Sequence, residues 1–232
     1  MKQVIFSIFI ILSAFVFGVS AQTAARQEFE NGISAAQNEK YETALVDFKK
    51  SLAFSRNEDV DSDFLARVHF NIGVSLYRLQ RNREAVAEYE LAIKLSEKSY
   101  EKAFYALGMA QSELKNWQAA ERAFLEAIRL NKRNGEAWFD LAFVYLAGKN
   151  FDAARAAFQK SIEYKSVDSS VGHNNLGVIF ALNGDLPSAV REFETALKES
   201  GGKLIEAERN LQFCKTVGQD LPVKLEFGKV EN

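Results

Sequence analysis

Residues 135–165 have the sequence GEAWFDLAFVYLAGKNFDAARAAFQKSIEYK, which contains two helical patterns separated by a short polar break. In the first pattern, apolar side chains recur at i, i+3, i+4 and i+7, the spacing that places them on one stripe of an α-helix. They are Trp138, Leu141, Ala142 and Tyr145. The Gly-Lys-Asn break that follows has residue types that end one helix and begin the next. The stretch therefore predicts a helical hairpin.

The same pattern occurs five times along the chain. Each copy has a small residue on the first helix, an alanine twelve residues later, and an aromatic residue four positions after the alanine. The alanines are 41, 35, 34 and 35 residues apart. Repetition at this period predicts stacked hairpins, each burying one face against the next. The three columns are Gly32, Gly73, Gly108, Ala142 and Gly177; Ala44, Ala85, Ala120, Ala154 and Ala189; and Phe48, Tyr89, Phe124, Phe158 and Phe193.

These columns, with Trp138 ahead of Leu141, resemble the tetratricopeptide repeat over residues 26–200. The proline that often closes a repeat of this family is absent from every copy. The resemblance implies an all-α fold, an α-solenoid of about five stacked antiparallel hairpins. We expect the repeats at about 26–55, 64–97, 101–132, 135–165 and 170–200. Residues 203–217 form an amphipathic run that predicts a capping helix. Its Asn210-Leu211 pair matches Asn175-Leu176 of the fifth repeat.

The N-terminus has the features of an export signal. Met1 to Ala21 contains one positive charge, a mostly apolar run from Val4 to Val19, and a small-x-small exit ending at Ala21. An uncleaved anchor is the alternative, but a membrane-spanning helix takes about 20 apolar residues and this run is shorter. No Asn-x-Ser/Thr acceptor occurs in the chain, which favours bacterial export. We therefore expect a periplasmic or secreted protein with no stable membrane anchor after cleavage.

The composition favours a protein without enzymatic chemistry. With 29 Lys and Arg against 31 Asp and Glu, the charge is nearly balanced, and no basic region indicates nucleic-acid binding. His69, His173 and Cys214 fall in separate segments, so they predict no catalytic, cofactor or metal site. Both histidines occupy the column filled elsewhere by Phe104 and Trp138, and we interpret them as packing residues with one solvated edge.

The single cysteine and the one acidic cluster have simple structural interpretations. Cys214 cannot form an internal disulfide, so we expect either a buried thiol in the capping helix or a covalent dimer. The acidic segment 58–63 begins like a calcium loop, but Phe64 and Phe70 stand where such a loop needs glycine and glutamate. We expect a solvated loop whose last aspartate, Asp63, helps to cap the next helix.

The resemblance also implies that the first helices of the repeats line a concave groove. Its side chains form a mostly apolar track, which predicts binding of protein or peptide segments. The alternative is that these rings pack between adjacent helices and are largely covered. The predicted groove residues are Phe29, Ile33, Phe70, Val74, Tyr77, Tyr105, Met109, Phe139, Phe143 and Leu146.

Some members of the family hold the terminal carboxylate of a peptide with Lys, Asn and Arg on these helices. Asn71 and Lys102 match that set. Phe29, Ile33 and Ala106 replace the remaining members, which argues against a carboxylate clamp here.

The last fifteen residues, 218–232, form a separate tail, extended or disordered. Apolar residues alternate with others from Leu221 to Phe227, a strand-like pattern in a helical chain. At about 3.3 Å per residue the tail could reach back along several helices. We expect it to occupy the groove until a partner displaces it, to add an edge strand to that partner, or to remain a frayed terminus.

Together these features predict an exported, non-enzymatic scaffold that binds protein segments, in the cell-envelope assembly or trafficking that the resemblance implies. Two alternatives stay open: a structural module that self-associates through one face, and a non-catalytic regulatory subunit of an envelope enzyme.

Overall fold

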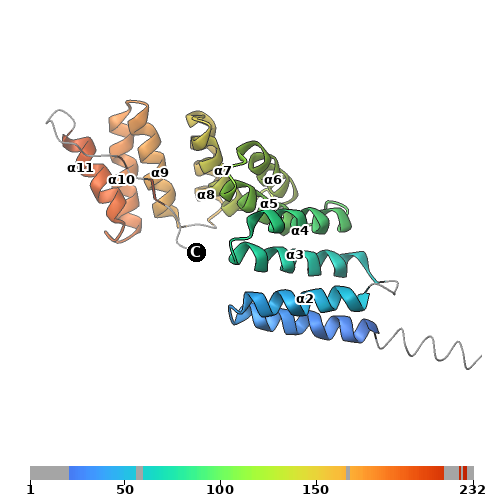
Figure 1. Cartoon of the computed structure of the whole chain (residues 1–232). Coiled ribbons are helices and arrows are strands. Elements are labelled where there is room, and N and C mark those ends of the chain that lie inside the picture. The colour runs from blue at the N-terminus through green and yellow to red at the C-terminus, as the bar shows by residue number, and fades with distance from the viewer. Residues whose placement is uncertain (1–20, 56–59, 166–167, 217–224, 226, 229–232) are drawn as a thin grey trace, which may run out of the picture. The chain divides into compact units, whose positions relative to one another are not determined.

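The computed structural model describes residues 21–55, 60–165, 168–216, 225 and 227–228. These residues form helices joined by short turns, with no strand among them (Figure 1). The predicted export signal, apart from Ala21, and residues 58 and 59 of the acidic segment lie outside the described residues. The chain separates into two compact units, Met1–Lys115 and Asn116–Asn232. None of the described helices is long and apolar enough to cross a lipid bilayer.

The N-terminal unit consists of antiparallel helices in which each packs on the next. A first helix covers residues 21–37. α2 packs on α3, α3 on α4, and α4 on α5. The bounds are α2 Tyr41–Ser55, α3 Ser62–Arg78, α4 Asn82–Leu95 and α5 Glu101–Glu113.

The C-terminal unit continues the same arrangement. Consecutive helices pack from α6 to α11, and α11 also contacts α9. The helix α11 occupies the segment predicted to cap the repeats. The bounds are α6 Trp117–Leu130, α7 Gly135–Ala147, α8 Phe151–Glu163, α9 Ser169–Leu182, α10 Leu186–Glu199 and α11 Ile205–Thr216. The predicted fold class, an all-α solenoid of stacked hairpins, is confirmed.

The repeated columns form the core. All five alanines of the column are 0% exposed, and the five aromatic residues are at most 1% exposed. The small residues are needed because the aromatic rings lie against them. At Gly73 an added Cβ would lie 2.6 Å from Tyr89 Cε1, and at Gly177 it would lie 2.5 Å from Phe193 Cε1. Helices therefore approach closely at the glycines, while the rings fill the space opposite.

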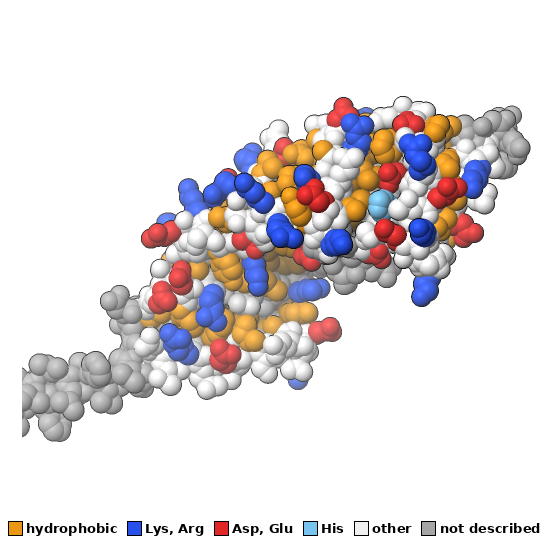
Figure 2. All heavy atoms as spheres, turned by 180° about the vertical axis from the view of Figure 1, so that it is seen from behind, with side chains coloured by type: hydrophobic (Ala, Val, Ile, Leu, Met, Phe, Trp, Pro, Cys, Tyr) orange, Lys and Arg blue, Asp and Glu red, His pale blue; other side chains and the backbone are white. Residues whose placement is uncertain are grey.

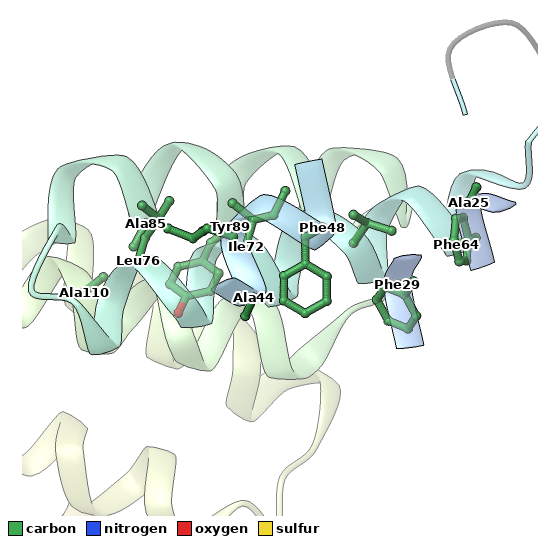
Figure 3. Close-up of a cluster of buried hydrophobic side chains, with 12 residues drawn as sticks. Ala25, Phe29, Ala44, Phe48, Phe64, Ile72, Leu76, Ala85, Tyr89 and Ala110 are labelled. Carbon is green, nitrogen blue, oxygen red and sulfur yellow. The ribbon is translucent and has the colours of Figure 1, made fainter. Parts of the chain in front are cut away.

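Aromatic rings from successive helices meet in the N-terminal unit. The Phe29 ring, on helix 21–37, lies 5.7 Å from the Phe48 ring of α2 and 5.5 Å from the Phe64 ring of α3, measured between centroids (Figure 3). The edge-to-face contact of Phe29 with Phe64 stabilises the packing beyond the burial of apolar area. The hydroxyl of Ser51 also joins α2 to helix 21–37, donating a 2.7 Å hydrogen bond to the Ala25 carbonyl.

Short polar side chains begin several of the helices, and Asn150 among them was expected from the Gly-Lys-Asn break. Asn134 caps α7, Asn150 caps α8 and Asp168 caps α9, each accepting a hydrogen bond from a backbone N–H of the first turn. At α3 the capping residue is Asp61, which accepts from the Asp63 N–H. The expectation that Asp63 is the cap is wrong by two residues, because Asp63 already lies inside the first turn of the helix.

Candidate functional site

The predicted groove residues of the N-terminal unit are mostly half-buried. Phe29 is the exception, because it is 3% exposed and lies in the core. The Phe70 ring packs 5.9 Å from the Tyr89 ring and 5.0 Å from the Tyr100 ring. These side chains thus support the helices and still reach the surface. The half-buried residues are Ile33, Phe70, Val74, Tyr77, Tyr105 and Met109.

The predicted groove residues of the C-terminal unit lie on α7. Phe139 is 4% exposed and packs edge-on against Phe158 at 5.5 Å. Phe143 and Leu146 are half-buried. As in the N-terminal unit, one ring of the set is enclosed between helices and the others retain some exposed surface.

A cluster of asparagines lies in the same unit, on α9 and α11. Asn174, Asn175 and Asn210 are each 0% exposed. The Asn210 amide donates to Asn174 Oδ1 at 2.8 Å, and the Asn174 amide donates to Asn175 Oδ1 at 3.3 Å. Buried amides need such partners because an unsatisfied polar group in the interior is costly.

Gly228, in the predicted tail, completes this cluster. Gly228 N–H donates to Asn175 Oδ1 at 2.7 Å, and Asn175 Nδ2 donates to the Gly228 carbonyl at 2.9 Å. A side-chain amide presents one donor edge and one acceptor, like a peptide group. The side chain of Asn175 therefore exchanges the same pair of hydrogen bonds with Gly228 that two paired residues exchange in an antiparallel sheet.

Two apolar side chains of the tail pack beside this pair. Phe227 contacts the core cluster of α7, α8 and α9 and also the cluster of α9, α10 and α11. Leu225 contacts the second of these clusters. Gly228 itself is buried. The other residues of the predicted tail lie outside the described residues, but Phe227 and Gly228 contact α9.

Sequence reasoning missed the asparagine cluster, although two signals were available. Asn174 stands in the column occupied by Phe29, Phe70, Tyr105 and Phe139 in the preceding copies, so the fifth repeat lacks its own ring there. The recurrence of Asn-Leu at 175 and 210 is the second signal. Neither indicates that residue 228, distant in the sequence, supplies the missing partner.

Each histidine pairs with a glutamate of the following helix. His69 Nδ1 lies 2.6 Å from Glu88 Oε2, and His173 Nδ1 lies 2.7 Å from Glu192 Oε2. Hydrogen bonding to Glu192 raises the pKa of the His173 imidazole above its ordinary value. The described residues contain no group of three or more His, Cys, Asp or Glu that could hold a metal ion.

Cys214 is a buried thiol in α11, in agreement with the first of the two sequence interpretations. It is 8% exposed and packs with Val178, Phe193 and Leu211. Burial raises the pKa of the thiol. A thiol held in its protonated form is a poor nucleophile, so its role in this structure is packing.

The charged side chains form no large patch of one sign on the face seen in Figure 2. Lys and Arg alternate there with Asp and Glu, and apolar side chains appear between them. Several of the ion pairs join residues three apart in the sequence, such as Arg81 with Glu84 at 2.8 Å. These exposed pairs contribute little to stability.

Family models match two segments of the chain. Both describe the tetratricopeptide repeat, one over residues 66–99 and the other over residues 105–168. These segments are tetratricopeptide repeats. Proteins built from tetratricopeptide repeats bind protein or peptide partners, and the scaffold is generally non-catalytic.

Solved structures share the fold. MamA from Desulfovibrio magneticus RS-1 superposes with a TM-score of 0.69 at 16% identity, covering 78% of this chain and 97% of that one. YrrB, described as a tetratricopeptide protein with an unusual peptide-binding site, superposes with a TM-score of 0.66 at 19% identity, covering 80% and 90%. At these identities the likeness shows the fold alone.

One curated relative is similar in sequence. Anaphase-promoting complex subunit 3 of Schizosaccharomyces pombe is 28% identical over 163 residues, which are 69% of this chain and 24% of that protein. The chain thus spans about a quarter of the length of this relative.

Proposed function

We propose that this protein is an exported scaffold that binds extended segments of other proteins, in cell-envelope assembly or trafficking. The observation that carries the proposal is the pair of hydrogen bonds between Asn175 and the backbone of Gly228. A site that holds the backbone of one segment in this way is suited to holding another, because the contact uses main-chain atoms that every residue has.

The surroundings of Asn175 are held in place by side chains of the scaffold itself. Its amide is aligned by Asn174, which is held in turn by Asn210 from α11. Helices packed through the repeated columns fix these side chains, so little conformational entropy is lost by the scaffold on binding. The description of YrrB as a peptide-binding tetratricopeptide protein supports the same use of the fold.

The half-buried apolar side chains give a second area for contact in the N-terminal unit. Tyr105 and Met109 on α5, with Val74 and Tyr77 on α3, keep part of their surface open to solvent. Covering such surface contributes about 25 cal/mol per Å². Because Phe29 is enclosed in the core, we assign the binding track of this unit to the half-buried members of the predicted set.

Photocrosslinking in the native compartment tests the proposal. A photoreactive phenylalanine analogue is placed at Tyr105 on α5 or at Phe143 on α7, both half-buried, with Leu125 as the control site. Leu125 is 40% exposed on α6, the second helix of its repeat. We expect both test sites to capture segments of exported proteins, mapped by mass spectrometry of the crosslinked peptides, and the control site to capture none of them.

Intact mass of the same preparation tests export. We expect a chain that begins at Gln22, because cleavage after Ala21 follows the small-x-small exit. A protein that retains Met1 would contradict export by cleavage. Equal capture at all three sites would contradict the binding track.

A further inference from the structure

At the position of Asn174 the fifth repeat lacks a ring that the four preceding copies have, and the tail brings an aromatic side chain to the same core cluster. Asn174 replaces the ring found at the equivalent position of the four preceding copies. Phe227 of the tail packs against the cluster that includes Val171, Leu176 and Ile179 of α9. The fifth repeat thus takes an aromatic side chain from another part of the chain. This is what a binding site for an inserted aromatic side chain would do.

The contacts of Gly228 add a second requirement. A Cβ at this position would lie 3.1 Å from Val171 Cγ1, closer than ordinary van der Waals contact. Asn174 Nδ2 at 3.4 Å and Asn175 Oδ1 at 3.7 Å would be in ordinary contact. Glycine brings the backbone near Asn175 without requiring Val171 to move. The two hydrogen bonds are made to the backbone, so they do not discriminate between amino-acid sequences. Discrimination between segments comes from the space available to the side chains at positions 227 and 228.

From these contacts we propose that the Asn175 site recognises extended segments with the order aliphatic, any residue, aromatic, glycine, and that residues 225–228 are its built-in competitor. The proposal rests on the proposed function and names the segment that the C-terminal unit takes. Leu225, Phe227 and Gly228 show the order in this chain. A partner segment must displace them to bind.

The tether makes the competition strong. Eight residues, 217–224, join the end of α11 to Leu225. Short tethers of this kind give effective concentrations on the order of millimolar. We take a dissociation constant of about 0.1 mM for the site, both for the tail and for a free segment. A tail at an effective concentration of about 1 mM then weakens the apparent affinity for the free segment by roughly tenfold.

Fluorescence anisotropy with a labelled peptide of residues 221–232 tests the proposal on the full-length chain. Gly228→Val opens the site, because the branched side chain would collide with Val171. We expect the peptide to bind this variant about tenfold more tightly than it binds the wild-type chain. A peptide carrying the same Gly228→Val substitution should bind at least about tenfold more weakly than the unmodified peptide, since the same collision now falls on the ligand.

A matched pair of asparagine variants identifies the site. In the opened chain, Asn175→Ala should abolish the gain in affinity. Asn71→Ala should retain it, because Asn71 occupies the equivalent column of the second repeat and donates to Arg67 of its own helix. Thermal unfolding followed by circular dichroism verifies that each variant is folded.

Three results would overturn the proposal. The first is equal affinity for the wild-type and opened chains, and the second is equal binding of the two peptides. The third is a concentration-dependent dimer in sedimentation that Gly228→Val removes, because the tail would then occupy a second copy. Any of them would leave capture at Tyr105 unaffected, since that site lies in the N-terminal unit, so the proposed function is tested separately.

Discussion

The ion pair of His173 makes stability depend on pH at the scale of one residue. Its Nδ1 lies 2.7 Å from Glu192, and its Nε2 lies 3.8 Å from Glu199. The hydrogen bond to Glu192 raises the pKa of the imidazole, and partial desolvation opposes that rise. The contribution of this ion pair to the free energy of unfolding is therefore complete below the imidazole pKa of the unfolded chain, about 6.5. It is lost as pH rises through the higher pKa of the folded protein.

Glu192→Gln tests this pair. We expect the variant to lower the free energy of unfolding by up to about 1 kcal/mol at pH 6, because the pair is partly solvated, and by less at pH 8. Urea unfolding at both pH values measures the two differences. A difference between variant and wild type that stays constant with pH would show that the imidazole is not the responsible group.

Residue burial could be predicted for the columns and not for the groove. The burial of Gly73 and Tyr89 could be predicted from the repeats. A small residue and an aromatic residue recur at these two positions in each hairpin. Phe139 and Tyr105 share a column as well, yet Phe139 is buried and Tyr105 is half-buried. The difference depends on which rings the neighbouring helices contribute, and Phe139 meets both Phe143 and Phe158.

Close packing of the helices depends on the glycines of the small column. In Gly73→Ala the new Cβ would lie 2.6 Å from Tyr89 Cε1 and 2.7 Å from Cδ1. The ring is 1% exposed and cannot move without disturbing the core. We expect a loss of about 1–3 kcal/mol in the free energy of unfolding, measured by urea denaturation.

Gly148→Ala is the matched control. Gly148 ends α7 at a negative φ of −82°, and its added Cβ would approach no atom nearer than 3.5 Å, the Tyr145 carbonyl. We expect a change within about 0.5 kcal/mol. Similar losses in both variants would mean that the small column does not set the helix spacing.

Helix caps also belong to this scale, and the Gly-Lys-Asn break predicted the one at Asn150. Asp185 caps α10, and Pro187 falls in its first turn. The cap of α3 was predicted at the wrong residue. Several aspartates alternate around the start of α3, and each could cap it. The structure shows that Asp61 is the residue whose side chain accepts the capping hydrogen bond.

For the molecule as a whole, the repeat pattern predicted the stacking of hairpins because each contact joins neighbours in the sequence. The docking of the tail is a different kind of contact. Asn175 and Gly228 are 53 residues apart, and no periodicity connects them. The alternation at 221–227 predicts an extended segment that could fold back, but the partner appears only when α9 and α11 bring the three asparagines together.

The central claim is that a buried side-chain amide holds the backbone of the tail at Gly228, and exchange of the Gly228 amide hydrogen tests it most directly. In nitrogen-15 NMR spectra of the full-length chain transferred to deuterated water, we expect this hydrogen to exchange at least about tenfold more slowly than in the Asn175→Ala variant, because only the wild type offers the acceptor at 2.7 Å. An equally fast, unprotected rate for Gly228 in both proteins would contradict the account.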